Sequence, residues 1–325
     1  MSFQSIPGQE RVKRILQNSL RTDKVSHAYI FTGPSGTGRK QMALAFAQAL
    51  YCQVLPDDAC GECLDCRKVE HGNHPDLHWI RPEGASIKIE QIRELQKQFS
   101  YRASASGLKM YILEDADKMT VQAANSLLKF LEEPTSRVVA ILITDNGQAL
   151  LPTIRSRAQW VPFAPMSRDR MVAVLQEEGH ASVLIQAAVR LTAGPDAARE
   201  LIQGNGFAEI RNLVIQLTKE SMSRLPTALL TAQQKLAKSE LTEQLPLFID
   251  LLILWLKDMV QLNLGNRSDL VYADQTDWMV GLALSYDMRH WVRCLEQAVE
   301  QQKRLRFHAN PQLVLEKLLM QLKGV

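Results

Sequence analysis

Two hydrophobic periodicities run through the first half of the chain. Short runs of aliphatic, β-branched and aromatic residues, typical of buried strands, lie at 27–31, 77–80, 110–113, 138–143 and 160–161. Between these runs, apolar residues recur every three or four positions, which predicts helices at 12–20, 42–50, 87–99 and 121–131. Strands that alternate with helices indicate an α/β fold with a largely parallel sheet.

The pattern becomes helical throughout after Pro165. Three short helices are expected first, at 168–179, 181–191 and 195–202. Further helical stretches follow at 210–222, 225–237, 241–262, 278–285, 290–302 and 311–322. This change of pattern predicts an α/β domain at 1–165, a small helical lid at 166–206 and an all-α domain at 207–325.

Composition and charge narrow the class of protein. Hydrophobic residues make up 46% of the 325 residues and charged residues 22%, which is ordinary for a globular protein. The net charge is only +3, so the composition does not indicate a strong positive potential that would attract nucleic acid. No apolar run approaches the roughly 20 residues of a membrane span. The first residues lack the basic region and apolar core of a secretion signal. We therefore expect a cytoplasmic protein with no membrane partner.

A glycine-rich loop at 33–40 lies between the first predicted strand and a predicted helix. In that setting, backbone N–H groups and the helix N-terminus bind polyphosphates. The standard loop ends in Gly-Lys-Ser/Thr, but here Arg39 stands at the Lys position and Lys40 at the Ser/Thr position. Nucleotide binding is therefore doubtful, and the candidate contacts in this degenerate P-loop are Gly33, Gly36, Gly38, Arg39 and Lys40.

Two acidic residues, Glu114 and Asp115, follow the predicted strand at 110–113. Acids at this position beside a phosphate loop usually hold Mg²⁺ and orient the attacking water, with an Asp before a Glu. The order is reversed here, and a displacement of about 1 Å can cost roughly 10²-fold in rate. The alternative is that both acids are solvated residues of a turn.

Four cysteines lie close together in the sequence at Cys52, Cys60, Cys63 and Cys66. The Cys-x₂-Cys-x₂-Cys spacing suits a structural zinc site with four ligands and no open position, within an insertion at about 52–74. Either His71 or His74 is an alternative to Cys52 as the fourth ligand. The competing interpretation is four cysteines without a metal. Cys294 is isolated on an apolar helical face and is expected in the core.

Taken together, these segments resemble the AAA+ ATPase subunits of the bacterial replicative clamp loader. The resemblance covers the P-loop domain well, continues through the lid and extends to the C-terminal helices only as a collar of similar length. The segments that carry it are Ile6-Pro7-Gly8-Gln9, the glycine loop, the cysteine insertion, the acidic strand end, Ser126-Leu127-Leu128-Lys129-Phe130-Leu131-Glu132-Glu133-Pro134, Thr144 and Ser156-Arg157.

The resemblance also indicates which kind of subunit this is. The motor subunits, gamma and tau, keep an intact loop, an Asp-Glu pair and a lid arginine. This chain departs in the loop, at Glu114-Asp115, at Ser156-Arg157-Ala158 where the family has Ser-Arg-Cys, and at Ala197 in the lid. The departures imply a non-hydrolysing subunit with no independent enzyme activity, working as a component of the DNA polymerase III holoenzyme.

The family further implies partners and a role for the arginine. Such a subunit would belong to a hetero-pentameric ring with gamma or tau motors and a delta subunit, which opens the sliding clamp and places it on primed DNA. Arg157 would act in trans as an arginine finger in the ATP site of a neighbouring motor subunit. Thr144 matches a residue of the family's nucleotide site.

Two other functions remain open at this point. The chain could be an active motor subunit or a stand-alone ATPase, in which Arg39 or Lys40 replaces the missing lysine. It could also be a zinc-dependent nucleic-acid-binding module, against which the low net charge and the few aromatic residues near the cysteines speak. Arg102 and Lys109 are the candidates for DNA contact.

Overall fold

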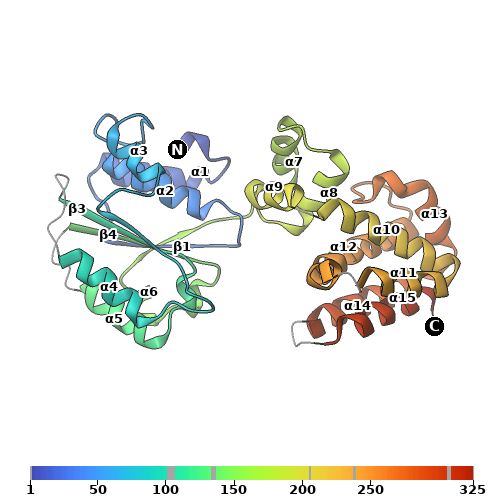
Figure 1. Ribbon diagram of the computed structural model, residues 1–325. Coiled ribbons are helices and arrows are strands. Elements are labelled where there is room, and N and C mark those ends of the chain that lie inside the picture. Colours follow the sequence, from blue (N-terminus) through green and yellow to red (C-terminus); the bar gives the residue numbers. More distant parts are fainter. Residues whose placement is uncertain are drawn as a thin grey trace. The chain divides into compact units, whose positions relative to one another are not determined.

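The computed structural model describes residues 2–100, 107–132, 137–204, 206–236, 239–305 and 309–324. The chain divides into two compact units, which Figure 1 shows from the N-terminus in blue to the C-terminus in red. The first unit comprises Met1–Ser167 with Ala193–Ala197, and the second comprises Arg168–Thr192 with Ala198–Val325. The expected lid is divided between the two units, and the three-domain division itself stays a prediction.

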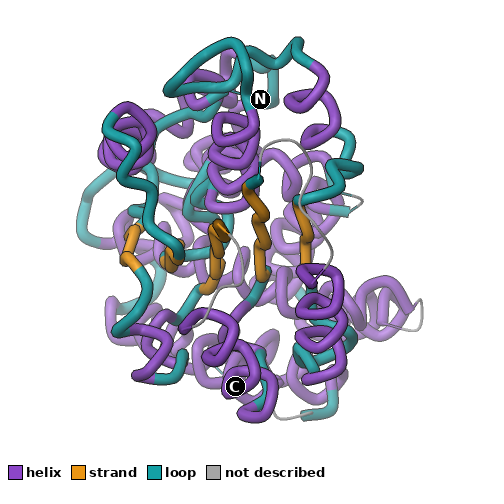
Figure 2. Tube along the Cα trace, turned by 90° about the vertical axis from the view of Figure 1, so that its left-hand side faces the viewer, coloured by secondary structure: helices purple, strands orange, loops and turns teal. Residues whose placement is uncertain are grey.

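A parallel sheet forms the centre of the first unit. Its five strands lie in the order β2-β3-β4-β1-β5, and every described pair is parallel, as the alternation of strands and helices predicted. Figure 2 shows these strands in orange. The bounds are β1 Ala28–Thr32, β2 Leu77–Ile80, β3 Leu108–Leu113, β4 Arg137–Thr144 and β5 Gln159–Pro162. The three middle strands are almost wholly buried, which explains their continuous apolar sequences.

Helices cover both faces of this sheet, as Figure 1 shows. One face carries α1 Glu10–Arg21, α2 Arg39–Tyr51 and α3 Leu64–Glu70, and the other carries α4 Ile89–Ser100, α5 Val121–Glu132 and α6 Pro152–Arg155. Each face has its own core, one centred on aromatic residues such as Tyr29 and Phe46, the other on aliphatic residues such as Ile92 and Leu127. Because the five strands are parallel, they all end at the same edge of the sheet, where the glycine loop begins.

The second unit is helical throughout its described residues, as the sequence predicted. Its α-helices are α7 Arg168–Glu177, α8 Ser182–Leu191, α9 Pro195–Gln203, α10 Phe207–Ser223, α11 Leu225–Leu236, α12 Ser239–Asn263, α13 Thr276–Leu284, α14 Met288–Leu305 and α15 Pro311–Lys323, with α9 beginning in the first unit. Trp255 of α12 packs on Trp291 of α14, with ring centroids 5.9 Å apart. None of the described helices combines the length and apolar character that crossing a membrane requires.

A buried carboxylate closes the long loop before α13. Asp258, on α12, is 4% exposed and accepts the backbone N–H groups of Val271 and Tyr272 at 2.9 and 2.8 Å. Burial raises the pKa of Asp258 to about 6, because it penalises the charged form more than the two N–H donors favour it. The loop is therefore held to α12 by a group that titrates near neutral pH.

We expect Asp258→Asn to remove a pH dependence of folding. The folded pKa lies above the ordinary value of 3.8, so the stabilisation is complete below about pH 4 and is lost as the pH rises through about 6. The free energy of unfolding of the wild type relative to Asp258→Asn should therefore fall by roughly 2–3 kcal/mol between about pH 4 and pH 7. Urea unfolding followed by tryptophan fluorescence measures this difference. The exposed Asp277→Asn is the control, and a pH-independent difference for Asp258→Asn would contradict the argument.

Candidate nucleotide loop and metal centre

The glycine loop joins β1 to α2 and has the backbone of a phosphate-binding loop. Gly33, Gly36 and Gly38 have φ angles of 152°, 82° and 84°, which side chains other than hydrogen rarely permit. The Thr37 hydroxyl donates to the carbonyl oxygen of Pro34 at 2.8 Å and tightens the turn. The three candidate glycines therefore lie together at the end of β1, where α2 begins with Arg39.

The segment Ala193–Ala197 packs directly on this loop within the first unit. A methyl group at Gly194 would overlap the carbonyl oxygen of Gly36, and one at Gly36 would overlap the Ala197 side chain. The remaining space between loop and segment is about 10 Å³, roughly what one water molecule occupies. The lid position that lacks an arginine, Ala197, thus contacts the loop itself.

Arg39, at the position of the usual lysine, is turned toward an acid of its own chain. Its side chain is 7% exposed and forms an ion pair with Asp145, which follows β4. Its Nη1 atom is buried without a hydrogen bond to any described group. The charge of Arg39 is therefore partly compensated within the chain, through its Nη2 atom.

Lys40 is neutralised in the same way by Glu114, at the end of β3. Glu114 also accepts hydrogen bonds from Trp79 Nε1 at 3.0 Å and Arg81 Nε at 3.1 Å. Burial alone would raise the pKa of Glu114, but the hydrogen bonds from Lys40 and Trp79 and the nearby positive charges outweigh it and lower the pKa. The carboxylate is therefore ionised and saturated by protein donors, which leaves it poorly suited to bind Mg²⁺.

The remaining candidates of the loop site are also engaged. Asp115 has a φ of 52° and accepts a hydrogen bond from Lys118 at 2.8 Å. The buried Thr144 hydroxyl donates to Asp117 at 2.5 Å and accepts from the Asn146 backbone at 3.0 Å. All eight candidate residues lie in or beside the loop and the ends of β3 and β4. Lys40 and Glu114 bind each other, and the other polar candidates bind neighbouring side chains, namely Arg39 to Asp145, Asp115 to Lys118 and Thr144 to Asp117.

Arg157 lies apart from these pairs, directly after α6. Its side chain is 38% exposed, forms an ion pair with Glu132 at 2.7 Å and donates to the Thr153 carbonyl oxygen at 3.0 Å. Glu132 is the last residue of α5, in the segment that carried the family resemblance. Glu133 and Pro134 of that segment lie outside the described residues. Arg157 is therefore a surface arginine held by an exposed acid.

The four cysteines of the insertion come together as the spacing predicted. Their sulfur atoms all lie within 4.8 Å of one another, and the group that could hold a metal ion contains no histidine among the described residues. Gly61 has a φ of 76°, and α3 begins directly after Cys63, so a tight turn and a helix start aim the thiols inward. His74, the alternative ligand, instead stacks on Tyr51 at 3.9 Å.

This donor set fits a tetrahedral metal ion. Four thiolates about 2.3 Å from zinc would be about 3.8 Å apart, and the Cys60 and Cys66 sulfur atoms are 3.9 Å apart. The Cys63 backbone N–H, which donates to the Cys60 sulfur at 3.3 Å, is the main cause that lowers the pKa of Cys60. Burial raises the pKa of Cys66, the opposite of what a free thiolate needs. A cation bound among the four would offset that cost.

Several functional contacts were not evident from the sequence. Asp145 and Arg81 form ion pairs beside the loop and Trp79 adds a hydrogen bond to Glu114, and only the place of Asp145 directly after a strand could have indicated its role. Lys109, which the sequence offered only as a candidate for DNA contact, is 3% exposed and donates to the Phe99 carbonyl oxygen at 2.8 Å, which leaves little of it for such a contact. Arg102, the other candidate, lies outside the described residues.

Comparison with known proteins identifies the family. A family model described as "DNA polymerase III, delta subunit" matches residues 8–167, the part that contains the sheet. The DNA polymerase III subunit delta' of Bacillus subtilis is 37% identical over 317 residues, covering 97% of this chain and 96% of that protein. The chain belongs to the delta' family of DNA polymerase III subunits.

Two further relatives of this delta' family member are a second delta' subunit and a tau subunit. The delta' subunit of Pseudomonas aeruginosa is 32% identical and matches 91% of each chain. The tau subunit of Bacillus subtilis is 33% identical over 198 residues, which cover 57% of this chain and 35% of tau. These two delta' subunits cover 97% and 91% of this chain, and that tau subunit covers 57%. The resemblance inferred from the sequence is confirmed.

In this delta' family member, adding one methyl group tests how closely the segment Ala193–Ala197 packs on the glycine loop. Gly194→Ala should lower the free energy of unfolding by roughly 1–3 kcal/mol, because its Cβ would overlap the Gly36 carbonyl oxygen. Thermal unfolding measures the effect. Gly281→Ala in α13 is the control, since a Cβ there meets open space. Equal stability of Gly194→Ala and the wild type would show that the segment does not pack on the loop.

The cysteine cluster predicts a bound metal in the purified protein. We expect about one zinc ion per chain by elemental analysis, and Cys63→Ser should lose most of it and unfold at a lower temperature. Cys294→Ser, which changes a buried cysteine in α14 outside the cluster, should keep the metal. Full metal content in Cys63→Ser, or none in the wild type, would contradict the assignment.

Proposed function

We propose that this delta' family member is a non-hydrolysing subunit of the bacterial clamp loader, the assembly that places the sliding clamp on primed DNA during replication. The observation that carries the proposal is where the positively charged side chains lie and which acids they bind. All three arginine and lysine side chains are paired with acids of the same chain, but Arg39 and Lys40 are paired with Asp145 and Glu114 beside the loop, whereas Arg157 lies apart from the loop on the surface, paired with the exposed Glu132. The chain would then lack an independent ATPase activity and would contribute to one in a neighbour.

The loss of hydrolysis follows from the chemistry that a working site needs. Phosphoryl transfer depends on a free lysine for the β- and γ-phosphates, a Mg²⁺ ligand and a base or water-positioning residue. Here Arg39 is paired with Asp145, Lys40 occupies Glu114, and Asp115 is bound to Lys118. These contacts support an ATPase-inactive subunit over the alternative of an active motor.

The trans role of Arg157 follows from its exposure and its weak partner. An ion pair between half-exposed side chains contributes at most about 1 kcal/mol, so a phosphate of an adjacent subunit can displace Glu132 at little cost. A guanidinium stays charged and bonds bidentately, and such an arginine is worth about 10³–10⁵ in rate in well-measured nucleotide hydrolases. We infer that Arg157 supplies this charge to the ATP site of a gamma or tau subunit.

The remaining parts of the chain fit this role in simple ways. The subunit would join gamma or tau motors and a delta subunit in a hetero-pentameric ring, with the helices at 207–325 as the collar. Sliding clamp and primed DNA would be reached through the complex. A structural zinc ion held by the four cysteines would stiffen the insertion after α2. A replication subunit of this kind works in the cytoplasm.

Replacing Arg157 in a reconstituted loader tests the trans role. Because the charge is used only during hydrolysis, Arg157→Ala should lower DNA- and clamp-stimulated ATP hydrolysis at the adjacent site by at least roughly 10²-fold, with the ring still assembled. Steady-state phosphate release, with the other motor sites disabled, measures the rate at this site.

Arg137→Ala is the matched control, since Arg137 is also an exposed arginine paired with an acid, Asp23, at 2.9 Å. It should hydrolyse ATP at the wild-type rate. Unchanged hydrolysis with Arg157→Ala would refute the trans role. Saturable ATP hydrolysis by the isolated wild-type chain would instead favour the motor-subunit alternative.

A further inference from the structure

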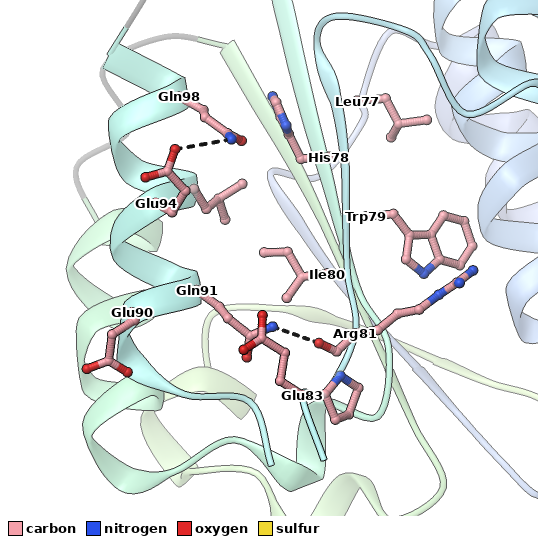
Figure 3. A pocket seen from close by; sticks show the side chains of 12 residues that line it. Leu77, His78, Trp79, Ile80, Arg81, Glu83, Glu90, Gln91, Glu94 and Gln98 are labelled. Atoms are coloured by element: carbon pink, nitrogen blue, oxygen red, sulfur yellow. Dashed lines mark hydrogen bonds between the residues drawn. The ribbon is translucent and has the colours of Figure 1, made fainter. Parts of the chain in front are cut away.

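A second surface of the first unit is hollowed at the β2 edge of the sheet. It lies between the outer edge of β2 and the facing side of α4, and has a volume of about 870 Å³. Figure 3 shows α4 alongside β2, with His78 and Ile80 pointing toward the helix and Leu77 and Trp79 pointing away. We call this the β2 groove, whose side chains include His78, Ile80, Glu83, Glu90, Glu94 and Gln98.

The backbone on one side of the β2 groove is open to a further strand around Trp79, whereas the Leu77 N–H already donates to the His74 carbonyl oxygen at 3.2 Å and the Arg81 carbonyl oxygen accepts from Gln91 at 2.8 Å. Within the part of the chain that the structure describes, β2 has a sheet neighbour on one side only, β3. The Asp76 and Ile80 carbonyl oxygens accept from Met110 and Glu114 at 2.8 and 2.9 Å. Since strand groups alternate in direction, the N–H and C=O of Trp79 point outward, away from β3. An extended chain placed there would continue the sheet.

The side chains of the β2 groove carry negative charge. Glu83, Glu90 and Glu94 are all exposed, and none forms an ion pair with another described residue. Arg81, the one arginine or lysine in the described lining, is bound to Glu114. Burial lowers the pKa of His78, so this residue adds no positive charge near pH 7. The groove therefore repels the phosphates of nucleic acid and favours cationic groups.

The spacing of the acids matches an extended chain. Glu90 and Glu94 lie one turn apart on α4, which corresponds to about 6 Å along the helix. Residues that point to the same side of a strand are about 6.6 Å apart. Two basic residues separated by one residue in a strand added to β2 can therefore meet Glu90 and Glu94 together. A helical or compact basic segment would not align with both the edge and these acids.

We propose that the β2 groove binds a basic segment of a partner protein, in extended conformation, by strand addition to β2. The backbone of the segment would bond to the outward groups of Trp79, and alternate lysine or arginine side chains would pair with Glu90 and Glu94. Apolar side chains on its other face would continue the surface formed by Leu77 and Trp79. This proposal does not depend on the role of Arg157 or on the metal.

The test uses the full-length protein and a defined probe. A fluorescent six-residue peptide of alternating lysine and valine should bind saturably by anisotropy. A glutamate–valine peptide should not bind, and neither should a lysine–valine peptide with methylated backbone nitrogens. Hydrogen exchange should show the Trp79 amide slowed when the first peptide is bound. If the methylated peptide bound as tightly as the first, charge alone would account for the binding, and strand addition would be overturned.

Reversing the charge of the helix identifies the site. The double variant Glu90→Lys, Glu94→Lys should bind the lysine–valine peptide at least about tenfold more weakly, because two attractive ion pairs become repulsive. Glu177→Lys with Glu209→Lys is the matched control, since both residues are exposed helical acids elsewhere and the change in charge is equal. Equal binding by the two double variants would overturn the proposal. A wild-type dimer that pairs through β2 and excludes the peptide would also overturn it, in favour of a second copy as the occupant.

Discussion

The ion pair between Lys40 and Glu114 is the contact on which the character of the first unit depends. It joins the start of α2 to the end of β3, the two places where a nucleotide hydrolase holds a phosphate and a metal ion. Trp79 of β2 and Arg81, just after β2, also donate to Glu114, so β2, the end of β3 and the start of α2 converge on one carboxylate. In this chain the charges at these two places bind each other.

The candidate metal centre and the glycine loop belong to the same α/β unit but are held in place by different kinds of contact. The cysteine insertion lies after α2 and depends on a local turn, with Gly61 and the start of α3 setting the ligand directions. The loop instead depends on contacts far apart in sequence, such as Arg39 with Asp145 and Gly194 with Gly36. Damage to the metal centre should therefore be local, whereas damage to the loop alters how several strand ends are held together.

Much of this structure was predictable because the signals are local. The β2 strand begins and ends at the predicted residues, and the cysteines cluster as their spacing requires. The short helices α3 and α6 were missed, since seven and four residues carry little periodicity. The sequence could show that Arg39 and Lys40 break the loop pattern, but not which acids they bind. That pairing depends on the order of strands β3, β4 and β1, and spacing along the chain does not reveal it.

The internal pairing of the loop charges has a consequence for evolution. A single change that restores the usual lysine at Arg39, or the usual threonine at Lys40, would disturb Asp145 or Glu114 before any nucleotide could bind. Removing Lys40 would leave Glu114, which is 11% exposed, with one charged donor fewer, whereas Asp145, the partner of Arg39, is 58% exposed and its pair contributes little. In the proposed ATPase-inactive subunit, a return to threonine at position 40 would therefore cost folding stability before any nucleotide could bind. Such a cost would keep the proposed subunit dependent on active neighbours.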